Sequence, residues 1–485
     1  MSPLDHALAT ASPRLTPRPT PLASFLIHGA VVVLWVVLFA RAFYLHGLLA
    51  WSTGIVYVIY DTVLLLFVAW QTLPLLKTPP RSSGLSDTAA PGPSLGVIVA
   101  AYNEAAVLPA TLTALLTQQN APEQILLADD GSDDNTAAIL ANHFGLVAPA
   151  LGEVSQASPL YPSLRWLRVA HHGKACALNA ALQVISSEIV MTVDADTLLA
   201  PDACRAMRHA FSCEAELVAA TGILTPWCGK TVSGRLFEWF QTYEYVRNFI
   251  SRAAWMRADS LLLISGAFAG FRRSAVLAVG GFDAACLVED YELIHRLRRY
   301  AVEHSLPWQV RVLGTARAMT EAPGSLSAFL RQRRRWFAGF LQTQYWNRDM
   351  TGNRRYGLLG LLMLPVKAID TLQPVYGLSA FFLLLGFLVT GHATIWVPVF
   401  SVIFGKIVID FAFHLWSVHL YRRWLGERTH THLFYALLAS LVEPFSFQLL
   451  RHTGATLGWV QFLFGRRSWG IQRRVGMALP TPREE

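Results

Sequence analysis

The sequence predicts a globular α/β domain inserted between two groups of membrane-spanning helices. Of the 485 residues, 53% are hydrophobic and only 15% are charged, whereas a soluble domain usually carries about 25% charged residues. The longest apolar runs lie at the two ends of the chain, and a more polar middle section separates them. This distribution excludes a disordered protein, a coiled coil and an ordinary soluble protein.

The charge balance and the cysteines narrow the classes of function. Lys and Arg number 40 and Asp and Glu number 32, which gives a formal net charge of +8. Such an excess is typical of cytoplasmic loops beside membrane spans, or of a protein with an anionic substrate. Nucleic acid is not favoured, because no basic module or Cys/His finger accompanies the charge. The five cysteines include no Cys-x-x-Cys pair, so they indicate a reduced compartment, with neither a disulfide framework nor a zinc site.

The N-terminal part is expected to contain a tail, two spans and a linker. Residues 1–21 are rich in Pro, Ser and Thr, and we expect them to be disordered. Within residues 22–77, the apolar runs Ala23–Tyr44 and Trp51–Leu76 each exceed the roughly 20 residues that cross a bilayer as a helix. Residues 78–94 contain four prolines and are expected to be the linker.

Residues 95–346 are expected to form the α/β domain. The short apolar runs Leu95–Ala101, Gln124–Ala128 and Ile189–Val193 are typical of buried strands. Thr111–Gln118, between the first two runs, has a helical pattern. Buried strands that alternate with helices predict a parallel sheet covered by helices on both faces.

Membrane character returns in residues 347–464. Three apolar stretches cover Tyr356–Val389, Ala393–Tyr421 and Leu433–Phe464. Pro and charged residues interrupt the first stretch, which is expected to be an interfacial helix followed by one span. The last stretch is expected to re-enter the membrane or to lie in the interface. A basic tail, residues 465–485, completes the expected organisation.

The basic residues predict the orientation of the chain. Seven arginines lie just before the third apolar stretch, namely Arg331, Arg333, Arg334, Arg335, Arg348, Arg354 and Arg355. Because cytoplasmic loops carry the excess of Lys and Arg, we expect an integral protein of the cytoplasmic (inner) membrane with its α/β domain in the cytoplasm. Two spans before the domain place the N-terminal tail on the same side.

Acidic groups stand at the ends of three predicted strands. They are Tyr102 and Glu104 after the first strand, Asp129-Asp130-Gly131 after the second, and Asp194-Ala195-Asp196 after the third. Ligands of open α/β sheets bind outside the carboxyl ends of the strands, so these groups predict one acidic crevice. Such a crevice binds a phosphate only when a divalent cation lies between the carboxylates and the phosphate.

Asp194 and Asp196 are the predicted ligands of that cation. Carboxylates two residues apart at a strand end can both reach Mg²⁺ or Mn²⁺. A lone Asp-x-Asp is often a solvated turn, but this one directly follows a buried strand. Lys174, after a glycine, has a flexible ammonium that suits a phosphate, with a surface lysine as the alternative. His171 and His172 are expected to be structural or surface residues.

Two clusters further along the chain complete the predicted site. Glu289 and Asp290 start an amphipathic helix, where a carboxylate serves either as a helix cap or as the general base for a sugar hydroxyl. Gln332, Arg335 and Trp336 are three and four residues apart, so they share one helix face. Trp336 offers a platform for a sugar ring, and Arg335 can pair with a diphosphate. The other arginines of this run are expected to mark the membrane surface.

Taken together, the motifs resemble those of the membrane-integrated family 2 glycosyltransferases, which include cellulose, hyaluronan, chitin and poly-N-acetylglucosamine synthases. The shared set is Asp129-Asp130-Gly131, Asp194-Ala195-Asp196, Ser265-Gly266-Ala267-Phe268, Gly280-Gly281-Phe282-Asp283, Glu289-Asp290, Thr320-Glu321-Ala322-Pro323 and Gln332-x-x-Arg335-Trp336. The resemblance covers residues 95–346 closely and the membrane layout loosely. It departs at Val288, where these enzymes have a Thr. Ser468-Trp469-Gly470 resembles a gating motif, with an interfacial anchor as the alternative.

The resemblance implies a GT-A (Rossmann-like) fold, a UDP-sugar donor and Mg²⁺ or Mn²⁺ as the cofactor. Asp290, with Glu289 beside it, is the implied catalytic pair, and the implied reaction is inverting and gives a β linkage. The other implied contacts are Tyr102, Glu104, Asp129 and Asp130 with the uridine, Lys174 and Arg335 with the diphosphate, Asp194 and Asp196 with the metal, and Ser265, Gly266, Gln332 and Trp336 with the acceptor.

Three functions follow from these observations. The first is a processive synthase that elongates a polysaccharide and passes it through its own spans. The second is a non-processive transferase that adds a sugar to a lipid. The third is an inactive scaffold or transport subunit, against which the intact carboxylates argue. The expected partners are a UDP-sugar, a growing glycan and membrane lipid. A small accessory membrane subunit stays open, and the motifs do not identify the sugar.

Overall fold

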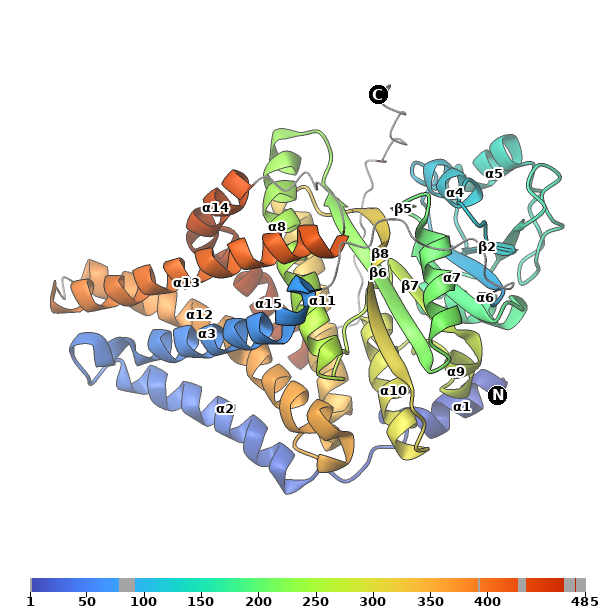
Figure 1. The fold of residues 1–485 in the computed structure, drawn as a ribbon. Coiled ribbons are helices and arrows are strands. Elements are labelled where there is room, and N and C mark those ends of the chain that lie inside the picture. Colours follow the sequence, from blue (N-terminus) through green and yellow to red (C-terminus); the bar gives the residue numbers. More distant parts are fainter. Residues whose placement is uncertain (1, 78–91, 391–392, 426–432, 466–475, 477–485) are drawn as a thin grey trace.

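The computed structural model describes residues 2–77, 92–390, 393–425, 433–465 and 476. A sheet domain with its own helices lies beside a bundle of long helices (Figure 1). The α-helices are α1 (Pro3–Ala11), α2 (Leu22–Arg41), α3 (Ser52–Thr72), α4 (Leu108–Leu116), α5 (Thr136–Phe144), α6 (Lys174–Val184), α7 (Ala203–Cys213), α8 (Val232–Arg257), α9 (Arg273–Ala278), α10 (Glu289–Glu303), α11 (Leu326–Trp346), α12 (Leu364–Val389), α13 (Ala393–Leu425), α14 (Leu433–Val442) and α15 (Phe447–Leu463).

The sheet has eight strands in the described residues, in the order β3-β2-β1-β4-β7-β6-β8-β5. They are β1 (Leu95–Ala101), β2 (Gln124–Asp129), β3 (Leu164–Arg168), β4 (Ile189–Asp194), β5 (Thr197–Leu199), β6 (Leu217–Trp227), β7 (Phe268–Arg272) and β8 (Gln309–Glu321). Short turns of 3-10 helix are η1 (Gly47–Trp51), η2 (Leu73–Leu76), η3 (Arg348–Met350), η4 (Arg354–Tyr356) and η6 (Glu443–Phe445), and η5 (Leu359–Met363) is a π-helix.

The prediction of a parallel sheet is right for four of the seven strand pairs in the described residues and wrong for the three that involve β7 or β5. β3, β2, β1 and β4 are parallel, but β7 pairs antiparallel with both β4 and β6. The reason lies at the end of β4, where the backbone N–H of Asp194 donates to the carbonyl of Ala267. The chain therefore enters β7 beside the carboxyl end of β4 and can only run back along it.

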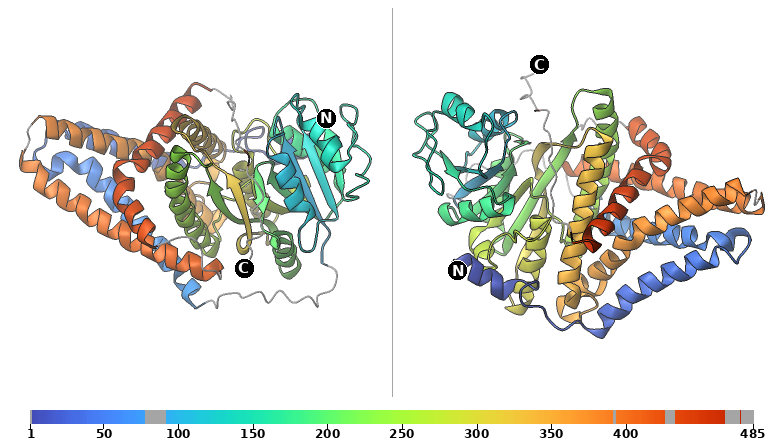
Figure 2. Two further views of the ribbon diagram at one scale, coloured as in Figure 1. Left: turned by 90° about the horizontal axis from the view of Figure 1, so that it is seen from above. Right: turned by 180° about the vertical axis from the view of Figure 1, so that it is seen from behind.

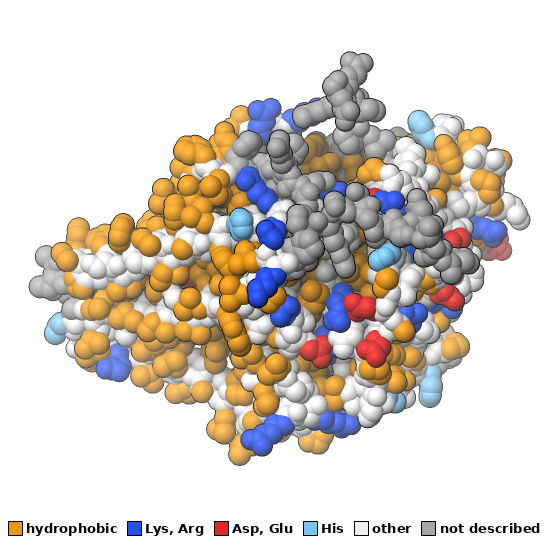
Figure 3. All heavy atoms as spheres, in the orientation of Figure 1, with side chains coloured by type: hydrophobic (Ala, Val, Ile, Leu, Met, Phe, Trp, Pro, Cys, Tyr) orange, Lys and Arg blue, Asp and Glu red, His pale blue; other side chains and the backbone are white. Residues whose placement is uncertain are grey.

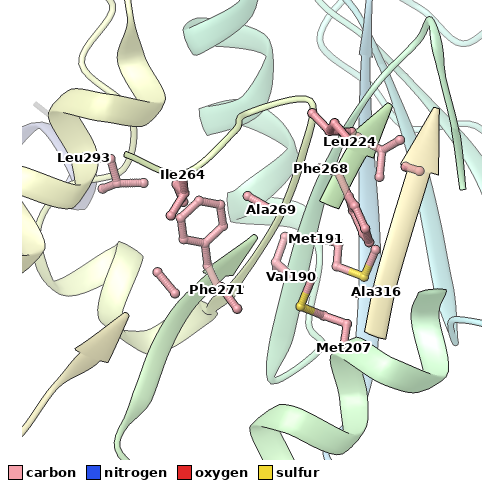
Figure 4. Close-up of a cluster of buried hydrophobic side chains, with 14 of the residues drawn as sticks. Val190, Met191, Met207, Leu224, Ile264, Phe268, Ala269, Phe271, Leu293 and Ala316 are labelled. Atoms are coloured by element: carbon pink, nitrogen blue, oxygen red, sulfur yellow. The ribbon is translucent and has the colours of Figure 1, made fainter. Parts of the chain in front are cut away.

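The core of the domain fills both sides of the central strands. Figure 4 shows Met191 of β4 near Met207 of α7 and Phe268 of β7, all of which are buried. Gly222 in β6 makes room for the Phe268 ring, since a Cβ at this position would lie 2.0 Å from the ring. Figure 1 shows α7 and α8 on either side of β6 and β8. The two helices pack against these strands.

Four helices in the described residues are long and apolar enough to cross a membrane. They are Leu22–Arg41, Leu48–Leu76, Leu359–Val389 and Trp396–Leu425. The long helices extend together to one side of the molecule (Figure 2), and hydrophobic side chains cover their visible surface (Figure 3). Two further segments, Leu433–Phe445 and Phe447–Leu463, are bent by 50° relative to each other. That this last stretch re-enters the membrane or lies in its interface stays a prediction.

Leu359–Val389 is one candidate span by length and composition. That its first part is an interfacial helix stays a prediction. The interruptions of this span are accommodated locally, because Pro365 falls in the first turn of α12, where no N–H is needed. Lys367 and Asp370 form an ion pair of 2.7 Å, and Tyr60 of α3 donates to Asp370. The polar groups are therefore satisfied inside the bundle.

The expected disorder of residues 1–21 is wrong for the described residues 2–21. Ser2 and Asp5 form a capping box that starts α1, and α1 packs against α9. Arg14 and Arg18 then pair with Asp283 and Glu303 of the sheet domain. The Pro-rich composition did not reveal these long-range partners.

The docking of α1 also bears on topology. Because α1 lies on the sheet domain (Figure 1), the N-terminal segment and that domain are on the same side of the first two candidate spans. That this side is the cytoplasm stays a prediction. Most of the expected linker and most of the basic tail, with Trp469, lie outside the described residues.

Candidate active site

The carboxyl ends of three neighbouring parallel strands bring the predicted acidic groups to one edge. β1 lies between β2 and β4, with Ala101 opposite Asp129 and Ala100 opposite Asp194. Tyr102 and Glu104 follow β1 directly at the same edge. The structure thus brings together the three clusters that the sequence places at strand ends.

Asp129 and Asp130 are turned inward and hold loops. Asp129 is only 1% exposed, and its carboxylate accepts from the indole of Trp166 and the backbone N–H of Ser132. Asp130 accepts from the backbone N–H of His172 at 2.9 Å and from that of Gly173 at 2.9 Å. The pair therefore fixes the turn after β2 and the segment that leads into α6. The sequence did not predict this loop-holding role.

A second feature that the sequence missed is a stacked pair beside these loops. The ring of Tyr102 lies on the imidazole of His171, with centroids 4.0 Å apart and planes 19° apart. His171 is oriented by Asp130, 2.8 Å away, and Tyr102 is 41% exposed. The pair presents a flat aromatic surface at this edge of the sheet. No spacing rule relates the two residues, because they come from segments after different strands.

Lys174 lies at the centre of the site. It is the first residue of α6, after Gly173 with φ of 96°, a conformation that favours glycine. Its Nζ lies 2.5 Å from Oδ1 of Asp194 and 3.5 Å from Oε1 of Glu289. Burial acts to lower the pKa of Lys174, but the attraction of Asp194 and Glu289 outweighs it and the pKa is raised. Lys174 is therefore a firmly charged ammonium.

Glu289 is the buried member of this triad. Burial raises its pKa above the ordinary value, although Lys174 acts in the opposite direction. Its carboxylate belongs to the first turn of α10, where the helix dipole favours negative charge. Glu289 thus links the start of α10 to Lys174 and, through it, to β4.

Asp194 and Asp196 are the residues that could hold a divalent cation. Asp194 ends β4, and Asp196 lies in the turn to β5, where the hydroxyl of Thr320 is 3.5 Å from its carboxylate. In the described part of the chain, no three His, Cys, Asp or Glu side chains are grouped closely enough to hold a metal ion. Two carboxylates suit Mg²⁺ or Mn²⁺ only if substrate phosphates complete the coordination. The donor set therefore fits a metal that binds together with a diphosphate.

Asp290 is fixed by two backbone groups. Its Oδ2 accepts from the N–H of Gly266 at 2.7 Å, and its Oδ1 accepts from the N–H of Tyr291 at 2.8 Å. A Cβ on Gly266 would lie 2.9 Å from that Oδ2. Gly266 therefore positions the carboxylate, a role beyond the contact with the acceptor that its motif implies. The backbone N–H of the neighbouring Ser265 donates to the hydroxyl of Thr221.

Buried ion pairs hold α10 in place behind these carboxylates. Arg296 and Glu292 pair within the helix with no exposure of either side chain, and Arg296 also donates to the carbonyl of Val279. Further along, Arg299 pairs with Asp349 of η3 through two bonds of 2.7 Å. A buried charge is costly unless it is paired in this way. The middle and the C-terminal part of the helix that carries Glu289 and Asp290 are therefore fixed by buried ion pairs.

Helix α11 supplies the last predicted residues. Arg335 donates to the carbonyl of Leu287, just before α10. The amide oxygen of Gln332 is buried and accepts no hydrogen bond from the residues that the structure describes. Trp336 is stacked by the guanidinium of Arg333, 4.7 Å from its ring centroid. Arg333, expected as a membrane-surface marker, is instead bound by Glu244 through two bonds of 2.8 Å.

The departure at Val288 has a packing explanation. Val288 is buried, and a Cβ on Gly339 of α11 would lie 2.5 Å from its methyl group. The branched apolar side chain thus seats the start of α10 directly on the backbone of α11. Val288 contributes to packing where a hydroxyl would contribute a hydrogen bond.

The mixed sheet with ligating groups at its carboxyl edge defines a GT-A-like α/β domain. Residues 96–280 match the family described as Glycosyl transferase family 2, and residues 189–405 match Glycosyl transferase family group 2. Residues 96–405 of the chain thus carry family 2 glycosyltransferase domains, as its motifs indicate.

Two curated relatives from staphylococci share one name. The chain is 28% identical over 292 residues to the poly-beta-1,6-N-acetyl-D-glucosamine synthase of Staphylococcus epidermidis, which covers 58% of this chain and 62% of the relative. It is 28% identical over 249 residues to that of Staphylococcus aureus strain COL, which covers 50% and 53%. The chain thus spans less than two thirds of the length of these relatives.

A solved structure supports the fold. It is a mannosyltransferase from Pyrobaculum calidifontis in complex with GDP-Man and Mn²⁺, with a TM-score of 0.52 and 18% identity. The match covers 82% of this chain and 99% of the mannosyltransferase. At this identity the similarity concerns the fold alone.

Proposed function

We propose that this chain is an inverting β-glycosyltransferase that uses a UDP-sugar to elongate a polysaccharide and passes the product through its own membrane helices. One observation carries the proposal. The carboxylate of Asp290 is fixed by Gly266 beside the Lys174–Asp194–Glu289 cluster, at the edge of the sheet where a nucleotide would bind. The names of the staphylococcal relatives support a polymer as the product.

The proposed reaction starts at Asp290. Its carboxylate takes the proton from an acceptor hydroxyl, whose oxygen attacks the anomeric carbon from the side opposite the diphosphate. The bond from that carbon to the diphosphate oxygen breaks, UDP leaves with the bonding electrons, and the configuration inverts to a β linkage. Asp290 has both oxygens held by backbone N–H groups, so its position relative to the acceptor is defined before the acceptor binds.

The proposed donor contacts follow from the charges. Lys174 and Arg335 balance the diphosphate, and a divalent cation held by Asp194 and Asp196 would neutralise the charge that develops on the leaving UDP. The uracil ring would lie against the Tyr102–His171 stack, near Glu104. Asp129 and Asp130 would act on the uridine mainly by shaping the two loops beside it.

The proposed acceptor contacts lie on α11 and before β7. The buried amide oxygen of Gln332 is suited to accept a bond from a sugar hydroxyl, and Trp336 to pack against the ring. Ser265 and Gly266 would border the same acceptor position. Helix α11 also packs along α15, which belongs to the bent pair in the membrane part. A product leaving the acceptor position would therefore pass directly to the helices that we place in the cytoplasmic membrane.

The deciding experiment measures product size. The full chain is purified, placed in lipid vesicles and given a panel of UDP-sugars, and UDP release and product length are recorded. A long polymer from one UDP-sugar is the expected result. Addition of a single sugar to a lipid would replace the polymer proposal by a lipid transferase. Absence of turnover with every donor, while UDP still binds, would favour the inactive scaffold or a requirement for an accessory subunit.

A further inference from the structure

We propose that residues 2–21, ahead of the first span, form a strap that positions the catalytic base, and that Arg14 is its positioning residue. The strap consists of α1 and the segment that joins it to α2. This inference rests on the proposed role of Asp290. It assigns a catalytic consequence to a segment that lies outside every motif of the site.

A partly buried ion pair fastens the strap to the sheet domain. Arg14 Nε lies 2.8 Å from Oδ2 of Asp283, and its Nη2 lies 3.0 Å from Oδ1. Asp283 is only 1% exposed, and the backbone N–H of Ala285 donates to the same carboxylate. The guanidinium also lies over the ring of Trp346, at 5.6 Å from the centroid. Loss of Arg14 would leave a buried carboxylate without its cation, so the loop around Asp283 would have to open or change.

Asp283 begins the loop that ends at the base. The loop runs from residue 283 to 288 and leads directly into Glu289 and Asp290. Gln342 of α11 binds the N–H of Leu287 at 3.1 Å and the carbonyl of Ala285 at 3.0 Å. Arg335 of the same helix binds the carbonyl of Leu287, and Asn179 of α6 binds Phe282, just before the loop. These supports come from helices that carry predicted site residues.

The strap also packs closely against the segment just before the loop, which Asn179 holds. The amide of Asn179 bonds both the N–H and the carbonyl of Phe282, each at 2.8 Å. At Gly280 a Cβ would lie 2.2 Å from the backbone nitrogen of Leu8 in α1. Glycine is therefore required for α1 to lie this close to the loop. The strap touches the Gly280-to-Asp283 motif at both of its ends.

The strap also joins this loop to the membrane part. Residues 12–21 run from α1 to Leu22, where the first candidate span begins. The near end of that span packs against Gly352, next to η3, whose Asp349 holds Arg299 of α10. A displacement of α2 would therefore act on both ends of the segment that carries the base.

The test compares Arg14→Ala and Arg14→Lys with wild type, all as full chains in lipid vesicles. Arg18→Ala is the matched control, since Arg18 lies on the same strap and its ion pair with Glu303 is more exposed. The turnover readouts are kcat and KM for the UDP-sugar, and the equilibrium affinity for UDP is measured separately. A readout independent of activity is the rate at which a thiol reagent labels Cys286, a buried thiol of the loop that is 3% exposed. Cys204 of α7, also buried, reports global unfolding.

We expect Arg14→Ala to lower kcat by about 10- to 100-fold, because a displaced base reacts poorly. KM and the affinity for UDP should stay within about twofold of wild type. Labelling of Cys286 should accelerate by about 10-fold while Cys204 is unchanged. Arg14→Lys should fall in between, because a lysine keeps the charge and loses the second bond. Arg18→Ala should match wild type in every readout.

Unchanged kcat and unchanged Cys286 labelling in Arg14→Ala would overturn the inference. Joint acceleration of labelling at Cys286 and Cys204, with loss of UDP binding, would overturn it in favour of a purely structural role. If wild type transfers no sugar from any donor, the proposed function fails, and labelling of Cys286 still decides whether Arg14 holds the loop.

Discussion

The ammonium of Lys174 lies 2.5 Å from the carboxylate of Asp194, which joins the residue predicted to hold a diphosphate to a residue predicted to hold a metal ion. The carboxylate of Glu289 also lies near this ammonium, with its Oε1 3.5 Å from Nζ of Lys174. One positive charge therefore balances negative charges from β4 and from α10. A bound diphosphate would compete with both carboxylates for Lys174, which frees Asp194 for a cation.

This arrangement predicts that UDP release depends on a divalent cation. Removal of divalent ions with EDTA should abolish turnover, and Mg²⁺ or Mn²⁺ should restore it, because Asp194 and Asp196 repel a diphosphate unless a cation separates them. Turnover is measured by UDP release at several cation concentrations. Full activity after exhaustive dialysis against EDTA would contradict a metal at these two residues.

The position of Asp290 predicts the effect of removing its charge. Asp290→Asn should lower kcat by about 10²- to 10⁴-fold, the usual range for loss of a general base. Asparagine keeps the size of the side chain, so UDP should bind with unchanged affinity. Asp259→Asn is a suitable control, since Asp259 is an exposed carboxylate that pairs with Arg298 near the far end of the same helix. Unaltered turnover in Asp290→Asn would rule out this residue as the base.

Gly266→Ala tests whether the backbone before β7 positions the base. The added methyl group would lie 2.9 Å from the Asp290 carboxylate, closer than carbon and oxygen normally approach. We expect kcat to fall by about 10- to 100-fold through displacement of Asp290. Gly386→Ala, in α12, has nothing within 4 Å of the new methyl group and should be silent. Equal activity of the two variants would show that the contact with Asp290 is unimportant.

Gln332→Ala tests the acceptor position. The amide oxygen is already buried and gains no bond within the described residues, so its removal should cost little stability. We expect shorter products. Release of UDP by hydrolysis of the donor should be retained. Product length on a gel, compared at equal UDP release, is the measurement. Wild-type product length would place the acceptor elsewhere.

His295 predicts how the helix that carries the base responds to acid. Burial lowers the pKa of His295 to about 4, and its Nδ1 is bonded to the carbonyl of Tyr291. The unfolded chain takes up the proton near pH 6.5 and the folded chain only near pH 4. The stability that His295 contributes is therefore present above about pH 6.5 and lost as the pH falls toward 4, by about 3 kcal/mol.

The variant His295→Gln removes this titration and keeps a donor for the Tyr291 carbonyl. Its loss of thermal stability between pH 7 and pH 4 should be smaller than that of wild type. His304→Gln is the matched control, because His304 makes the same bond to the carbonyl four residues before it and is exposed. Equal acid sensitivity of wild type and His295→Gln would contradict the prediction. Thermal unfolding in detergent at each pH provides the measurement.

The sequence by itself determined the elements that carry the site and the order in which they occur. Buried strands such as β1 and β4 are short apolar runs that end in Asp or turn residues, and both the run and its end are local features. The first four candidate spans are recognisable for the same reason, since length and composition are properties of one continuous segment. Asp194, Glu289 and Asp290 could be named because each stands at the end of such an element.

Only the tertiary structure decided which of these groups meet. Gly266 and Asp290 are 24 residues apart, and Arg14 and Asp283 are 269 apart, so no periodicity relates them. The inward orientation of Asp129, the antiparallel course of β7 and the docking of α1 depend on which strand lies beside which. A local sequence pattern indicates whether a residue is buried. Which residue it contacts depends on the path of the whole chain, and so does the position of the catalytic base.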